Sequence, residues 1–105
     1  MDCIFCKIKN KEIPAKVVFE NEKAVVFHDI KPKAPVHYLV IPKKHVASLN
    51  EMKEEDKELL GDLLFTAREA AEKAGIKETG YKLAIHTGEG GGQEVFHFHI
   101  HLMGG

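Results

Sequence analysis

The stretch that decides the fold is EVFHFHIHL, residues 94–102, in which polar and apolar side chains alternate. This alternation predicts a β-strand, because successive side chains on a strand point to opposite faces of the sheet. His97, His99 and His101 would line one face, with successive imidazoles roughly 7 Å apart. The apolar residues that alternate with them would enter the core beneath a helix.

A helix that could cover this core is predicted over residues 53–74, where leucine and alanine recur at helical spacing. Acidic residues crowd its first turns, which suits the helix dipole, and Gly75 follows its last turn, where a C-terminal cap prefers glycine. This is the clearest helical pattern in the chain.

Shorter elements complete the expected fold. β-branched and aromatic residues predict a hairpin with a tight turn at Asn21 and Glu22, and two further strands later in the chain. These strands are expected at residues 16–20, 23–28, 36–41 and 80–86, with a loop between the second and third at residues 31–35. A short N-terminal helix is expected at residues 2–8, where Asp2 could cap it.

This order of elements predicts an α+β fold in one domain, residues 1–105. A five-stranded, mostly antiparallel sheet would carry the long helix on one face. Such a sheet leaves its edges exposed, so we expect a homodimer in which the sheet continues across a twofold axis.

Composition narrows the function classes. The formal net charge of −1 provides no excess of positive charge that would attract nucleic acid or an anionic membrane surface, so neither is expected as a partner. No apolar run reaches membrane-spanning length, and no signal peptide precedes the domain, which predicts a cytoplasmic protein.

Cys3 and Cys6 form a C-x-x-C pair. In a reducing compartment a structural disulfide is disfavoured, which leaves zinc binding or redox chemistry.

Three histidines on one strand face indicate chemistry, since imidazole serves in proton transfer, nucleophilic attack or metal binding. The glycine-rich loop at residues 88–92 precedes them, and its backbone amides could form an anion site. It is neither a P-loop nor a Rossmann turn, because no Lys-Ser or Lys-Thr and no helix follows. Beside three histidines it is interpreted as a phosphate cradle.

The run GGQEVFHFHIHLMGG, residues 91–105, resembles the H-x-H-x-H signature of the histidine-triad (HIT) superfamily. Three more blocks agree in order: IFCKI, FHDIKPKAPVHYLVIPKKH and GYKLAIHTGEGGGQ. Together they are similar to the Hint branch, the histidine-triad nucleotide-binding proteins, over nearly the whole chain. The resemblance implies a purine nucleotide ligand of the AMP or GMP type. It also implies a hydrolase that converts nucleoside phosphoramidates or acyl-nucleotides to nucleoside monophosphate.

The resemblance assigns roles to the histidines. His99 would attack the α-phosphorus and form a nucleotidyl-histidine, which water would then hydrolyse. His101 would contact the α-phosphate, and His37 and His97 would complete the cluster. No cofactor would be needed for this catalysis.

Other positions would hold the nucleotide. The Gly92 amide and Gln93 would bind phosphate oxygens. His86 and Glu94 would lie near the phosphate, where Hint members usually carry asparagine and some carry serine. The base and ribose would lie against a set of apolar residues and the turn between them, comprising Ile4, Phe5, Ile8, Phe27, His28, Asp29 and Ile30. Asp29 would bond the ribose hydroxyls. From the residues alone, the apolar members could equally be core and Asp29 an Asx-turn.

Some bacterial relatives suggest that Cys3, Cys6, His45 and His97 form a structural zinc site. Reduced thiols without metal are the alternative. Other functions also stay open: a dinucleoside-polyphosphate hydrolase, a zinc-stabilised nucleotide sensor, or a triad that itself holds a catalytic zinc.

Overall fold

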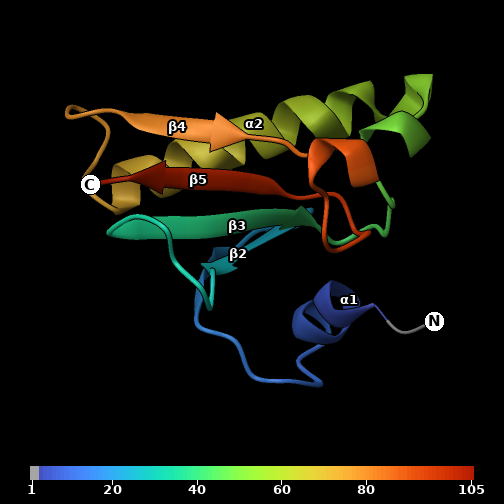
Figure 1. Cartoon of the computed structure of the whole chain (residues 1–105), viewed down its shortest axis with the longest axis horizontal. Coiled ribbons are helices and arrows are strands. Elements are labelled where there is room, and N and C mark those ends of the chain that lie inside the picture. Colours follow the sequence, from blue (N-terminus) through green and yellow to red (C-terminus); the bar gives the residue numbers. More distant parts are fainter. Residues whose placement is uncertain (1–2) are drawn as a thin grey trace.

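An antiparallel five-stranded sheet, in the order β1-β2-β3-β5-β4, forms the centre of the computed structural model, which describes residues 3–105 (Figure 1). The strands are β1 (Val17–Glu20), β2 (Ala24–His28), β3 (Val36–Pro42), β4 (Tyr81–Ala84) and β5 (Ile100–Gly104). The helices are α1 (Ile4–Lys9) and α2 (Lys57–Lys73). All four strand pairings are antiparallel, which confirms the predicted α+β class.

The main core lies between the sheet and α2. Alternate residues of the central strands point toward this helix and pack against its leucine and alanine face. They include Ala24, Val26, Tyr38, Val40, Ile100 and Leu102, and Phe98 joins them from the segment before β5. The predicted partition therefore holds: Phe98, Ile100 and Leu102 enter the core, on the opposite side from the histidines.

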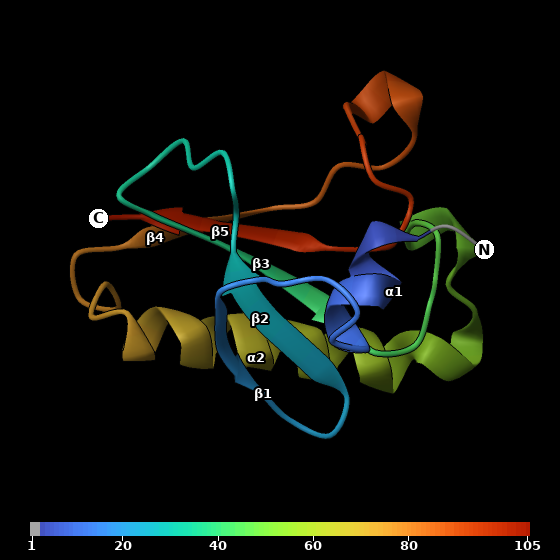
Figure 2. The ribbon, with the colours of Figure 1, turned by 90° about the horizontal axis from the view of Figure 1, so that it is seen from below.

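A smaller apolar cluster lies on the other face of the sheet, beneath α1. Val25, Phe27, Leu39 and Ile41 supply the strand side, and Phe5 supplies the helix side. The short helix covers only part of this face. Figure 2 shows the β2–β3 connection and the loop with the 3₁₀ turn Glu89–Gly91 rising from the side opposite α2. That side of the sheet carries the functional histidines.

Helix α2 begins later than predicted, and the predicted glycine follows its last turn. The segment Glu54–Asp56 is a 3₁₀ turn, so the α-helix begins at Lys57 rather than at residue 53. The Asp56 carboxylate accepts a hydrogen bond from the Lys53 backbone amide at 2.9 Å. At the other end Gly75 adopts φ +75°, a left-handed conformation that glycine accommodates without strain.

Two strand predictions were wrong in extent. β5 starts at Ile100 instead of residue 94, because the preceding backbone bonds elsewhere: the Phe98 amide donates to the Val46 carbonyl. β4 ends at Ala84 rather than residue 86, which leaves His86 in the loop. The hairpin turn has three residues instead of two, since the Asn21 side chain accepts hydrogen bonds from the amides of Lys23 and Ala24.

Two further observations bear on the sequence predictions. Cys3 caps α1 by accepting from the Cys6 amide, whereas the predicted cap Asp2 lies outside the described residues. Across residues 3–105, neither helix combines the length and apolar character needed to cross a bilayer.

Candidate active site

Three histidines meet on the sheet face opposite α2. His37 lies on β3 and His101 on β5, and the register that pairs Leu39 with His101 places both on this face. His99 precedes β5, and its ring contacts His101 edge-on at 5.0 Å between centroids. That separation is shorter than the strand spacing predicted, because the chain bends before Ile100 and the rings lean together.

The hydrogen bonds of His99 assign its tautomer. Its Nδ1 lies 2.7 Å from the carbonyl oxygen of His97, so Nδ1 carries the proton and donates it. The lone pair is therefore on Nε2. The side chain is only 7% exposed and packs edge-on against Phe5, with ring centroids 5.1 Å apart. The structure thus holds a neutral imidazole with an oriented nucleophilic nitrogen.

A chain of hydrogen bonds orients His101 in the same way. The Lys33 amide donates to Nδ1 of His37 at 3.0 Å, which places the proton of His37 on Nε2. This Nε2 lies 2.9 Å from Nδ1 of His101 and 3.3 Å from a carboxylate oxygen of Asp29. When His101 accepts that hydrogen bond, its own proton is on Nε2. His101 can then donate a hydrogen bond to an oxygen bound in the site.

Burial favours the neutral form of two of these rings, His99 and His101. It lowers the pKa of His101 to about 4, and the nearby His99, His37 and His86 add to the shift. It also lowers the pKa of His99. A neutral imidazole is the form that can act as a nucleophile or as a hydrogen-bond donor without prior proton loss.

The Gln93 side chain is bonded to the backbone at three places. Both hydrogens of its side-chain amide are used, one by the Ala47 carbonyl at 2.7 Å and one by the Val95 carbonyl at 3.0 Å. Its oxygen accepts from the Gly88 amide at 2.9 Å. In this arrangement both amide hydrogens are engaged, and the phosphate contact expected of Gln93 stays a prediction. The side chain fixes the glycine loop beside the histidines.

The apolar residues expected around the base divide into two groups. Phe5 and Phe27 are buried and contact each other edge-on at 5.4 Å, so their packing role is plain. Ile8 is partly buried against the same cluster. Ile4 is 47% exposed and Ile30 is 89% exposed. This exposed pair supplies apolar surface that an aromatic base could cover.

At the turn that follows β2, the side chains of the neighbouring residues His28 and Asp29 point in different directions. One carboxylate oxygen of Asp29 accepts from the Lys31 amide at 2.8 Å, which is the Asx-turn considered above, and the other faces His37. His28 points the other way. Its ring packs on Tyr38, a residue of the α2 core, at 4.9 Å. Strand alternation turns this side chain to the opposite face, and a nucleotide contact of His28 stays a prediction.

The remaining predicted residues lie around the cluster. The His86 ring stacks on His101 with centroids 4.9 Å apart and planes 28° apart. Gly92 adopts φ +82°, and a Cβ there would lie 3.8 Å from Nδ1 of His86. Glu94 is exposed in the loop between Gln93 and His97. Contacts of Gly92 and Glu94 with phosphate stay predictions.

A second cluster joins the N-terminal cysteines to two histidines: Cys3, Cys6, His45 and His97 place one donor atom each within 4.8 Å of one another. The two Nδ1 atoms lie 3.1 Å apart, and the sulfur–nitrogen distances between hydrogen-bonded pairs are 3.3–3.6 Å. A tetrahedral zinc with ordinary Zn–S and Zn–N bonds has edges of about 3.3–3.8 Å. The donor set and its spacing therefore fit zinc.

The hydrogen bonds and pKa shifts of these side chains favour the binding of a cation. Nε2 of His97 donates to the Pro42 carbonyl at 2.8 Å, so its Nδ1 directs a lone pair at the cysteines. Burial lowers the pKa of His97 to about 4, which keeps it a neutral ligand. Burial and the adjacent Cys3 raise the pKa of the Cys6 thiol. A cation would favour the thiolate form that this environment otherwise disfavours.

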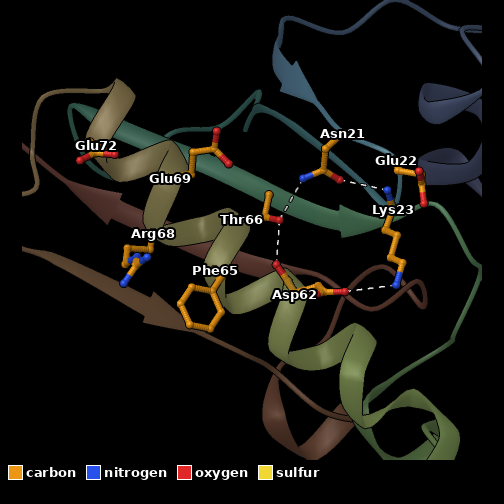
Figure 3. A pocket seen from close by; sticks show the side chains of 9 residues that line it. All are labelled: Asn21, Glu22, Lys23, Asp62, Phe65, Thr66, Arg68, Glu69 and Glu72. Atoms are coloured by element: carbon orange, nitrogen blue, oxygen red, sulfur yellow. Dashed lines mark hydrogen bonds and ion pairs between the residues drawn. The ribbon is translucent and has the colours of Figure 1, made fainter.

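A hollow of about 600 Å³ lies away from both clusters, between the β1–β2 turn and α2 (Figure 3). Asn21 donates to the Thr66 hydroxyl at 3.2 Å, and Lys23 pairs with Asp62 at 3.3 Å. These contacts join the hairpin to the helix. The lining of the hollow contains no histidine or cysteine, so we assign no catalytic or metal site to it.

Sequence reasoning missed the backbone groups that orient the histidines: the Lys33 amide and the carbonyls of Pro42 and His97. Backbone atoms are common to every residue, so no sequence signal could have identified them. The involvement of Asp29 with His37 was also missed, because it depends on the pairing of β2 with β3.

Comparison with known proteins gives consistent matches. A family model described as the C-terminal binding domain of the scavenger mRNA decapping enzyme, a HIT-like domain, matches residues 2–105. Protein HitA of Neisseria gonorrhoeae is 52% identical over 98% of this chain and 95% of its own. A HIT family hydrolase from Legionella pneumophila Philadelphia 1 has a TM-score of 0.96 at 50% identity, covering 99% of this chain and 93% of that chain.

Two more distant solved structures carry informative names. A histidine triad nucleotide-binding protein from Candida albicans has a TM-score of 0.87 at 34% identity, over 96% of this chain and 73% of that chain. A zinc-bound histidine triad family protein from Mycobacterium smegmatis has a TM-score of 0.82 at 33% identity, over 98% of this chain and 74% of that chain.

Proposed function

The chain belongs to the histidine-triad (HIT) superfamily, and we propose that it is a purine nucleotide-binding hydrolase. The solved structures that it matches include HIT family hydrolases. Its substrates would be nucleoside phosphoramidates or acyl-nucleotides, and its product a nucleoside monophosphate. The observation that carries this proposal is the tautomer of His99, which leaves Nε2 free as a nucleophile. The nucleotide-binding name of the Candida albicans relative supports the ligand class.

The proposed reaction has two displacements at the α-phosphorus. In the first, Nε2 of His99 forms a bond to phosphorus while the bond to the leaving group breaks. In the second, water attacks the nucleotidyl-histidine, the P–N bond breaks, and nucleoside monophosphate is released. Splitting one hydrolysis into two steps is the general advantage of covalent catalysis.

The surrounding groups have assigned parts in this scheme. As His99 gains a bond, positive charge develops on its ring, and the Nδ1–H bond to the His97 carbonyl stabilises that charge. Nε2–H of His101 would donate to a non-bridging phosphate oxygen, and the His37 relay holds it in that tautomer. Exposed Ile4 and Ile30 would contact the base, and Asp29 would turn from His37 to the ribose.

The second cluster is assigned a structural zinc. Cys3, Cys6, His45 and His97 would hold the ion, and the name of the zinc-bound Mycobacterium smegmatis relative supports this. A closed four-ligand site contributes folding energy and leaves no open position for substrate. It would also fix His97, whose carbonyl oxygen orients His99. We prefer this to a zinc held by the triad.

We also propose a homodimer and a cytoplasmic location. Strand β4 is one edge of the sheet, and Leu83 on it is partly exposed. Leu64 and Phe65 of α2 are exposed too, the latter by 62%. These apolar residues would be covered when two β4 edges pair. Two free cysteines arranged as metal ligands suit a reducing compartment.

The test compares wild-type protein with His99→Ala, using an adenosine 5′-phosphoramidate for turnover and calorimetry with AMP for binding. We expect His99→Ala to lose hydrolysis by a factor of at least about 10³ while AMP still binds, because only the nucleophile is removed. Wild-type protein that binds AMP without turnover would indicate a nucleotide sensor. Faster cleavage of a diadenosine polyphosphate would indicate the other hydrolase class.

A further inference from the structure

A fourth histidine contacts the cluster from the loop after β4. His86 stacks on His101, with centroids 4.9 Å apart and planes 28° apart, whereas the other contacts within the cluster are tilted or edge-on. His37 and His99 are buried and His101 is partly buried, but His86 is exposed. Of these four rings, it is the one in open exchange with water.

The glycine loop lies beside one edge of this ring. Nδ1 of His86 lies where a Cβ on Gly92 would be 3.8 Å away, so the backbone of the loop passes along that edge. Gly92 itself is in a left-handed conformation, and the Gln93 side chain secures the loop through Gly88. The Nδ1 edge therefore faces the loop, and among residues 3–105 no hydrogen bond engages Nε2.

The buried histidines are unsuited to supplying a proton to a leaving group. His101 uses Nδ1 to accept from His37, and a phosphate oxygen would take its Nε2–H. Burial and the neighbouring rings lower the pKa of His101 to about 4, and His86 is one of these neighbours. With His99 as the nucleophile and His101 on the phosphate, the exposed ring of His86, stacked on His101, is the one left to reach the leaving group.

We infer that His86 is a catalytic residue that protonates the leaving group, and that it adapts the site to leaving groups that need a proton, such as amines. This inference rests on the proposed hydrolase function. As His99 Nε2 bonds to phosphorus, the P–N bond breaks, its electron pair returns to the amine nitrogen, and that nitrogen takes the proton from Nε2 of His86. Neutral His86 then accepts a proton from the water that attacks the nucleotidyl-histidine, which restores the starting state.

The experiment separates leaving groups by their need for a proton. It measures kcat/KM of wild type and His86→Asn on an alkylamine phosphoramidate of adenosine 5′-monophosphate and on its p-nitrophenyl ester. The amine must be protonated as it leaves, whereas p-nitrophenolate leaves as a stable anion. We expect His86→Asn to lose about 10²-fold or more on the phosphoramidate, the usual contribution of a general acid, and less than about 3-fold on the ester.

The control is Glu69→Asn, at an exposed position on α2, the helix that lies on the opposite face of the sheet from the histidines. It should leave both rates unchanged. Equal losses on both substrates in His86→Asn would overturn the inference and indicate a binding or packing role, and so would no loss on either. Wild-type protein that hydrolyses neither substrate would overturn the proposed function, and the inference with it. Retained ester hydrolysis also shows that the variant is folded.

Discussion

At the scale of single residues, the site is defined by where protons sit on its rings. Each of three histidines has one nitrogen occupied by a partner: His99 by the His97 carbonyl, His37 by the Lys33 amide and His101 by His37. These bonds hold one tautomer of each ring: they leave Nε2 of His99 and Nε2 of His101 for the substrate, whereas Nε2 of His37 donates to His101. Such preorganisation lowers the cost of reaching a transition state, because no rotation or proton exchange precedes attack.

Neutral buried histidines make stability depend on pH. His97 is fully buried, and its pKa in the folded protein falls from the ordinary 6.5 to about 4. The unfolded chain therefore binds a proton below about pH 6.5 that the folded chain does not, so stability is present above that pH and is lost as the pH falls toward 4. His101 shifts in the same direction.

Urea unfolding measures this effect. Between about pH 7 and about pH 5, we expect the free energy of unfolding to fall by about 2 kcal/mol from His97 alone. Excess chelator at both pH values keeps metal release out of the comparison. Unchanged stability over this interval would show that His97 is not held neutral by burial.

At the scale of elements, the glycine loop and the segment before β5 act as one unit held by Gln93. The side chain of this residue makes three hydrogen bonds to the backbone, at Gly88, Ala47 and Val95. It joins the loop to the connection that leads from His45 toward α2. The positions of Gly92, His86 and His97 all depend on this arrangement.

Substitution at Gln93 tests that role. We expect Gln93→Ala to lower the free energy of unfolding by about 1–3 kcal/mol, because it leaves three partly buried backbone groups without their partner. The neighbouring Glu94→Ala is the control, since Glu94 is exposed and its loss should change stability by less than about 0.5 kcal/mol. Equal, small effects in urea unfolding would contradict a structural role for Gln93.

The same segment shows how far local sequence could predict the fold. Alternation correctly placed Phe98 with the core and His99 with the site, because the direction of side chains follows the extended backbone even without strand pairing. It could not predict that pairing begins only at Ile100, since this depends on the distant Val46 carbonyl and the Gln93 side chain. Strand alternation likewise turns the His28 side chain away from Asp29, which the motif alone could not show.

At the scale of the whole molecule, two clusters share one residue. The His97 side chain belongs to the cysteine cluster, and its carbonyl oxygen belongs to the site. Zinc on the cysteine cluster would tie α1 to the segment after β3 and to the segment before β5. The N-terminal helix, which covers part of the site-bearing face, would thus be anchored beside His99.

Metal removal tests this link. Purified protein should contain about one zinc per chain, and a strong chelator should lower Tm by about 10 °C or more, which corresponds to the loss of a few kcal/mol in a domain of this size. A Cys3→Ser/Cys6→Ser variant should start at the lower Tm and show no further shift. Metal-free wild-type protein with a Tm that is insensitive to the chelator would contradict the zinc site.

The central claim is that His99 is the nucleophile, and the most direct measurement is intact-mass spectrometry of protein quenched in acid during turnover of an adenosine phosphoramidate. We expect wild-type protein to carry one nucleotidyl group per chain, located on the peptide that contains His99, and His99→Ala to carry none and to be inactive. Equal turnover by the two proteins, or wild-type turnover in which the nucleotidyl group never appears on His99, would contradict the account.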